Sequence, residues 1–135
     1  MKRLDITKKF VATSQAKGYL DDLVKKKVFQ RRIDAYVFAA TYAIKQNTDI
    51  SQPLTDRHSS LVEVYSLDDD VRLALEAGIH TICKRNNLPE PENSAEVMKL
   101  LTKYAEAGIE LLQQKWQDKT SVSQIQQDIW QIINQ

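Results

Sequence analysis

The sequence predicts an all-α protein with about five helices packed around one core, and three observations support this prediction. Glycine and proline occur only three times each in 135 residues, too rarely for the turns of a protein built from strands. Hydrophobic residues make up 42% of the chain and charged residues 27%, which is typical of a globular domain. Apolar side chains recur at helical intervals of three and four residues. We expect residues 1–135 to form a single domain.

Two helices are predicted in the first third of the chain. The first runs over residues 15–27, with Thr13 or Ser14 as its cap. The second runs over residues 30–46 and is apolar around more than half of its circumference, so it should be deeply buried. Residues 47–56 are polar, include a proline and are predicted to form a loop. The second helix also has small residues that would let another helix approach closely: Ala35, Ala39, Ala40 and Ala43.

Apolar and polar side chains alternate weakly over residues 61–67, which predicts a segment that is either irregular or briefly extended. A lone strand has no ladder partner, so this segment would need to pair with another segment or another chain. The aspartates at residues 68–70 predict the start of a third helix, because carboxylates suit a helix N-terminus. That helix should stop at Asn86 or Asn87, since asparagine tolerates the left-handed conformation.

A long fourth helix is predicted to follow the connector at residues 86–96. Asn93 and Glu96 have the spacing of a capping box, with Asn in place of the usual Ser or Thr. The apolar positions then continue with helical spacing to about Gln117.

The Gln-rich last helix, about residues 120–135, opens at Ser121 or Ser123 and carries a narrow apolar seam with heptad spacing. Two heptads are too few for a free coiled coil, so the helix must pack on the body of the protein or on another chain. The narrow seam and the large aromatic side chain of Trp130 suit one partner helix, so the last helix is predicted to form an interface, with a homo-oligomer as one outcome. The predicted interface residues are Val122, Ile125, Ile129, Trp130 and Ile132. Packing on the protein's own body is the alternative.

Charge is unevenly distributed along the chain, although the net charge is only +1. Residues 1–32 hold ten Lys or Arg against three Asp, a net of +7, whereas residues 33–135 carry a net of −6. Cations at the start of the second helix oppose its dipole, and a start without a side-chain cap leaves amides free for phosphate. We therefore predict that five residues bind the DNA backbone: Lys25, Lys26, Lys27, Arg31 and Arg32. A solvated corner, with Arg31 paired to Asp34, is the alternative.

The sequence shows no catalytic, cofactor-binding or metal-binding constellation. The two histidines, His58 and His80, have no partners at zinc-ligand spacing. Cys83 follows His80 by three residues, but a nucleophile also needs an orienting group and an oxyanion site. Glu106 and Glu110, one helical turn apart, are interpreted as a solvated pair. We expect no enzymatic activity, no cofactor and no metal.

The chain shows no sign of export or membrane insertion. Its basic N-terminal residues are not followed by the apolar stretch of a signal peptide. The longest apolar run, residues 35–44, is too short to span a bilayer. The single cysteine excludes an internal disulfide and fits a reducing compartment. We expect a cytoplasmic protein with no membrane partner.

Three patches carry a further pattern: VFQRRIDAYVFAATYAI from Val28, then Pro53 and Leu54, then YAEAGIELL from Tyr104. Together they resemble the small accessory proteins encoded beside bacterial DNA phosphorothioation (Dnd-type) modification and restriction systems. The chain departs from that pattern in residues 45–52, which lack the expected glycines, and in the added last helix. The resemblance implies a prokaryotic defence context and a DNA-associated accessory role without enzymatic activity. It rests on these residues: Val28, Phe29, Asp34, Phe38, Ala39, Ala40, Tyr104, Ala105, Gly108 and Leu112.

These observations predict a non-enzymatic accessory protein of a bacterial DNA modification or defence system. It would bind the DNA backbone, or a DNA-processing partner, through its basic N-terminal part, residues 1–32. The alternative is a protein–protein interaction or oligomerisation module that does not bind nucleic acid directly.

Overall fold

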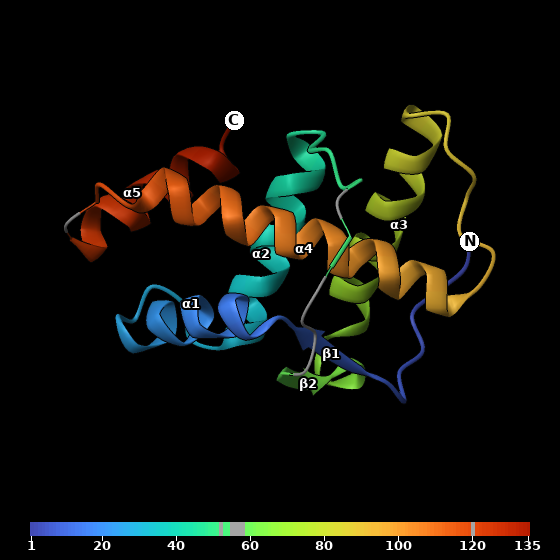
Figure 1. Ribbon diagram of the computed structural model, residues 1–135, viewed down its shortest axis with the longest axis horizontal. Helices are drawn as coiled ribbons and strands as arrows, with labels where there is room; N and C mark the ends of the chain where they lie inside the picture. Colours follow the sequence, from blue (N-terminus) through green and yellow to red (C-terminus); the bar gives the residue numbers. More distant parts are fainter. Residues whose placement is uncertain (52, 55–58, 120) are drawn as a thin grey trace.

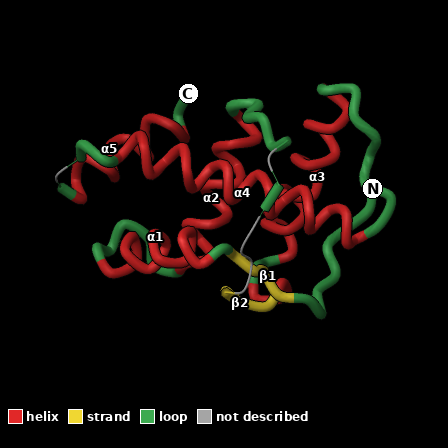
Figure 2. Tube along the Cα trace, in the orientation of Figure 1, coloured by secondary structure: helices red, strands yellow, loops and turns green. Residues whose placement is uncertain are grey.

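The computed structural model describes residues 1–51, 53–54, 59–119 and 121–135. Within these residues five α-helices surround one core, together with a two-stranded sheet (Figures 1 and 2). The all-α prediction with about five helices is confirmed. The elements are β1 (Lys9–Ala12), α1 (Ser14–Lys25), α2 (Arg32–Lys45), β2 (Ser59–Glu63), the 3₁₀ turn η1 (Val64–Ser66), α3 (Asp69–Arg85), α4 (Ser94–Trp116) and α5 (Val122–Ile133).

The long helix α4 crosses α2 at the centre of the molecule (Figure 1), and small residues make this contact possible. Ala39 and Ala40 of α2 are fully buried there. A Cβ atom added to Gly108 of α4 would lie only 1.9 Å from the carbonyl oxygen of Ala39. No side chain fits in that space, so glycine is required for the crossing. The prediction that the small residues of α2 permit close helix approach is therefore confirmed.

The sheet joins two segments that are far apart in the sequence. β1 pairs antiparallel with β2, Phe10 lies opposite Val62, and a bulge follows between Phe10 and Val11. Phe10 and Ala12 point into the core and are fully buried. Of the two alternatives for residues 61–67, the extended one is present, but the strand begins earlier, at Ser59, and the segment continues as η1. Its partner β1 was not predicted, because four residues are too few to show a period of two.

The helix ends follow local side-chain chemistry. The Thr13 hydroxyl caps α1 by accepting a hydrogen bond from the Ala16 amide. Asn93 caps α4 by accepting a hydrogen bond from the Glu96 amide, and Ser121 forms a capping box at the start of α5. Asn87 ends α3 in the left-handed conformation, with φ 56°. Each of these caps is among the alternatives that the sequence predicted.

Helix α5 packs on the protein's own body. Ile125 and Ile132 of its seam are buried. The Trp116 indole donates a 2.7 Å hydrogen bond to Asp128, and the Lys45 ammonium donates one of 3.0 Å to the Ile132 carbonyl. This corrects the predicted interface at Ile125 and Ile132, because the hydrophobic effect already covers these side chains within the chain. Val122 and Ile129 are half-buried, whereas Trp130 is exposed.

None of the helices in the described part of the chain combines the length and apolarity needed to cross a bilayer.

Candidate nucleic-acid interface

The five predicted cations surround one corner of the molecule, called here the basic corner: Lys25, Lys26, Lys27, Arg31 and Arg32. Residues 26–31 join the end of α1 to the start of α2. Lys27 adopts a left-handed conformation with φ 63°, and the Val28 amide donates back to the Leu23 carbonyl. This closure ends α1 and reverses the chain. The Phe29 ring then packs on Phe38, with 5.6 Å between centroids, and anchors the connection.

Helix α2 begins without a side-chain cap among the described residues. Arg31 occupies the cap position with an extended backbone. Its guanidinium donates two hydrogen bonds to Asp34, of 3.1 and 2.8 Å. These bonds raise the pKa of Arg31 above its ordinary value, with smaller contributions from the negative charges of Asp34 and Asp68. The predicted pairing of Arg31 with Asp34 is confirmed.

Carboxylates of the same corner pair with three of its five cations. Lys25 and Lys27 are exposed and form no ion pair with any residue that the structure describes. Residues 21–34 hold five cations and three aspartates, a net charge of +2. The unpaired positive charge is therefore concentrated on Lys25 and Lys27. The three ion pairs are Arg31 with Asp34 at 2.8 Å, Lys26 with Asp22 at 3.1 Å and Arg32 with Asp21 at 3.7 Å.

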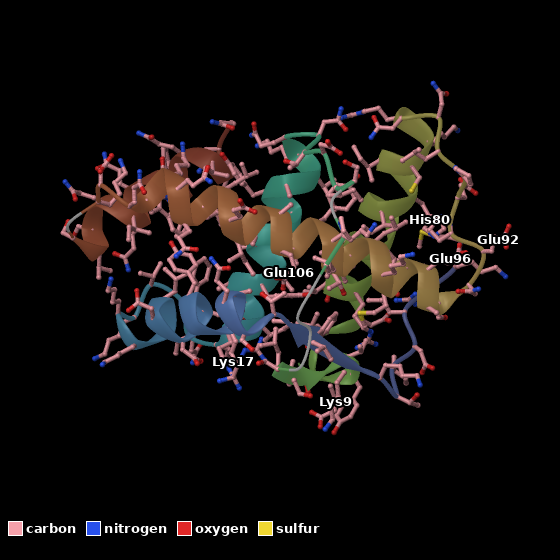
Figure 3. All side chains as sticks on the ribbon, viewed as in Figure 1. Lys9, Lys17, His80, Glu92, Glu96 and Glu106 are labelled. Atoms are coloured by element: carbon pink, nitrogen blue, oxygen red, sulfur yellow. The ribbon has the colours of Figure 1, made fainter. Side chains whose placement is uncertain are left out.

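Of the remaining cations of residues 1–32, Lys17 borders the basic corner, because it contacts Asp21, the partner of Arg32, at 3.1 Å. Arg3 lies at α3, where it contacts Asp69 and Glu76 at 2.8 and 2.7 Å. Lys9, in β1, projects from the lower edge of the molecule in Figure 3. The positive charge of residues 1–32 is thus spread over several surfaces, and the candidate interface is narrower than the sequence suggested.

A buried carboxylate that the sequence analysis missed holds the N-terminal segment on α3. Glu76 is only 1% exposed, and its two oxygens accept hydrogen bonds from Arg3 Nε at 2.7 Å and the Leu4 amide at 2.6 Å. His80, one turn further along α3, contacts the Lys2 carbonyl oxygen at 3.0 Å. The sequence did contain a sign of this burial: Glu76 lies three residues before Ile79, on the face of the helix that the apolar spacing predicts to be buried.

Glu106 is half-buried and structural, so its interpretation as a solvated residue was wrong. Its carboxylate accepts hydrogen bonds from the Thr13 hydroxyl at 2.7 Å and the Thr13 amide at 3.3 Å. These bonds tie the start of α1 to α4 and orient the capping hydroxyl. Glu110, one turn later, is exposed.

The described residues contain no group of three or more His, Cys, Asp or Glu that could hold a metal ion. His58 lies outside the residues described. Cys83 is buried, and this burial raises the pKa of its thiol, with a further contribution from the negative charge of Glu90. A raised thiol pKa disfavours the nucleophilic thiolate.

Two hollows lie away from the basic corner. The first, of about 520 Å³, is polar and opens between the start of α1 and α4, beside Lys103, Glu106 and Glu110. The second, of about 360 Å³, is mainly apolar and lies between α2 and α3. It is lined by Val37, Thr41, Ile44, Asp70, Val71, Ala74, Leu75 and Gly78.

Comparisons of the chain with models of protein families, with curated proteins and with solved structures found no match. The resemblance to Dnd-associated accessory proteins therefore stays a prediction. The structure does explain several of the residues that carry it. Ala39 and Gly108 meet at the crossing of α2 and α4, and Phe29 packs on Phe38. These residues of the resemblance therefore serve helix packing, so they are evidence about the fold more than about function.

Proposed function

We propose that this protein is a non-enzymatic accessory protein that binds the DNA phosphate backbone through the basic corner, either alone or beside a DNA-processing partner. The observation that carries the proposal is the convergence of cations from two helix ends, with Lys25 and Lys27 exposed and unpaired among the described residues. Lysines of this kind attract phosphates and displace condensed counterions. The resemblance described above adds a bacterial DNA modification or defence system in the cytoplasm as the setting.

Binding of this kind positions a protein on the duplex without reading the sequence. The basic corner offers no flat exposed aromatic platform, because Phe29 packs on Phe38. Duplex DNA is therefore the better ligand than single strands, which need aromatic stacking. The three ion pairs of the corner keep its net charge modest, so the affinity should be low and non-specific.

Charge reversal at the two unpaired lysines tests this proposal. Lys25→Glu combined with Lys27→Glu should weaken binding to any duplex by about tenfold or more at low salt, because two phosphate contacts are lost. The slope of log affinity against log salt should fall by about two. Fluorescence anisotropy with two labelled duplexes of unrelated sequence measures both quantities.

A matched control carries the same change in net charge elsewhere. Lys84 and Lys99 are exposed on α3 and α4, away from the basic corner. Lys84→Glu combined with Lys99→Glu should leave the salt slope nearly unchanged. Equal losses in the two double variants, or a parent protein that does not bind DNA at low salt, would refute phosphate binding at this corner.

A second candidate function is a protein–protein interaction module, and one observation favours it. Trp130 and Ile133 on α5 are 66% and 65% exposed, although both are large and apolar. Such side chains dominate the energetics of interfaces when a partner covers them. This candidate does not require nucleic-acid binding.

A further inference from the structure

The apolar hollow between α2 and α3, called here the α2–α3 groove, has the form of a receptor for a helix. Val37, Thr41 and Ile44 line it from α2 with spacings of four and three residues. Val71, Ala74 and Gly78 line it from α3 with spacings of three and four. Two helix faces with this spacing leave a furrow that an amphipathic helix can fill with one apolar ridge. Thr41, Ala74 and Gly78 are small, so the furrow stays open.

The same chain carries an uncovered ridge of matching character. Trp130 and Ile133 lie three residues apart on α5, so they project from one side of the helix. Their neighbours one turn away are Gln126, Gln127, Ile129 and Asn134, none of which is charged. Removing a charge from water is the main energetic obstacle to covering a polar helix face, and burial of this ridge would not require it.

The ridge cannot cover the groove of its own chain. Figure 1 shows α5 and α3 on opposite sides of α2. The Lys45 ammonium donates to the Ile132 carbonyl and so holds α5 beside the C-terminal end of α2. Ile44, the preceding residue, lines the groove. Ridge and groove therefore border the same end of α2 from different sides, and only another molecule can bring them together.

We propose that a second copy of this chain fills the groove: the Trp130–Ile133 ridge of each copy lies in the α2–α3 groove of the other. A two-fold axis beside the C-terminal end of α2 makes both contacts at once and closes the assembly as a dimer. The two elements carry opposite charges: the Lys45 ammonium is bonded to the Ile132 carbonyl at the end of α5, and Asp70 lines the groove. The proposal rests on the second candidate function and is independent of DNA binding.

Two single variants separate the two halves of the contact. Trp130→Ser removes the ridge, and Ala74→Arg fills the groove; both residues are exposed, so the fold of the chain should persist. Sedimentation equilibrium of the full chain should show a dimer, and each variant should weaken the dimer by about 30-fold or more, as at an interface hot spot. Tyr65→Ser, which removes an exposed aromatic residue elsewhere, should leave the dimer unchanged.

Mixing the two variants gives the decisive measurement. The Ala74→Arg chain keeps its ridge and the Trp130→Ser chain keeps its groove, so an equimolar mixture should form a heterodimer through one intact contact. This heterodimer should be stronger than either variant's own dimer. A mixture that associates no better than its components would overturn the proposal, as would a parent chain that stays monomeric at the highest concentration reached.

Other outcomes distinguish the ridge-in-groove dimer from the more general function of a protein–protein interaction module. Dissociation by Trp130→Ser but not by Ala74→Arg would overturn the groove as the acceptor, while α5 would remain an interaction helix. Circular dichroism of each variant checks the fold, and Thr41→Arg replaces Ala74→Arg if the latter is unfolded, because Thr41 is also exposed in the groove.

Discussion

Gly108 is the residue on which the central packing contact depends. Gly108→Ala would place a methyl group 1.9 Å from the Ala39 carbonyl oxygen, and neither backbone can move without displacing a helix. We expect a loss of about 3 kcal/mol in the free energy of unfolding, at the upper end of the usual range for overpacking. Denaturant titration followed by circular dichroism measures this loss.

Gly18 provides the matched control. A Cβ atom added there meets nothing within 4 Å, and α1 has no need of glycine at this position. Gly18→Ala should therefore stabilise the protein by about 0.5–1 kcal/mol through helix propensity. Similar effects of the two substitutions would mean that α2 and α4 do not approach as closely as described.

Asp69 makes the protein sensitive to acid. The hydrogen bond from Arg3 lowers the pKa of Asp69 below its ordinary value of 3.8, and Arg72 adds to the effect. Because the pKa is lower in the folded state, this carboxylate stabilises the fold at pH values above 3.8. That contribution is lost as the pH falls through the folded-state pKa.

Asp69→Asn should therefore reduce the dependence of stability on pH below about 4. Urea midpoints measured between about pH 2.5 and pH 6 give this dependence directly. Asp70→Asn is the control, because no arginine contact is found for Asp70 within the described residues. An unchanged slope in Asp69→Asn would show that the contact with Arg3 does not persist in solution.

At the scale of elements, α5 completes the core while keeping one face uncovered. Ile125 is buried and Trp130 is 66% exposed on the same helix. Ile125→Ala should cost about 2–5 kcal/mol in the free energy of unfolding, because it leaves a cavity. Trp130→Ala should change the free energy of unfolding of the monomer by only about 0.5 kcal/mol, as for other surface positions.

Truncation after Lys119 extends this comparison. It removes Ile125 and Ile132 from the core and leaves the Trp116 indole without Asp128. The shortened chain should melt at a lower temperature or aggregate. A truncated chain that melts at the parent temperature would show that α5 does not pack on the body. The whole seam of α5 would then be explained as an interface with a partner.

The whole molecule has one connected core. Buried apolar residues from Leu4 near the N-terminus to Ile132 in α5 form a single cluster. We therefore expect one cooperative unfolding transition, with equal calorimetric and van't Hoff enthalpies, as for other small single domains. Two resolved transitions would mean that α5 or the N-terminal segment unfolds separately.

The surface charge of the whole molecule is less unevenly distributed than the difference between residues 1–32 and 33–135 indicates. Folding places Arg3 against Glu76 and pairs three cations of the basic corner with nearby aspartates. The excess positive charge of residues 1–32 is thus partly neutralised within the protein. What remains unpaired at the basic corner lies on Lys25 and Lys27, which is why the charge reversals above are placed there.

The sequence by itself determined the helices, the side-chain caps of α1, α4 and α5, and most of the buried face of each helix. These features depend on residues within one or two turns of each other, so the period of apolar side chains and the capping residues Thr13, Asn93 and Ser121 were sufficient. The pair of Arg31 and Asp34 is also local, and it too was predicted.

Only the tertiary structure decided the features that join distant segments. The pairing of β1 with β2, the bonds of Glu76 with Arg3 and those of Glu106 with Thr13 depend on which elements meet in space. The same holds for α5, whose seam suited a partner chain and the protein's own body equally well. Burial and charge pairing are properties of the assembled surface, and a period along one helix shows that a face is apolar without showing what covers it.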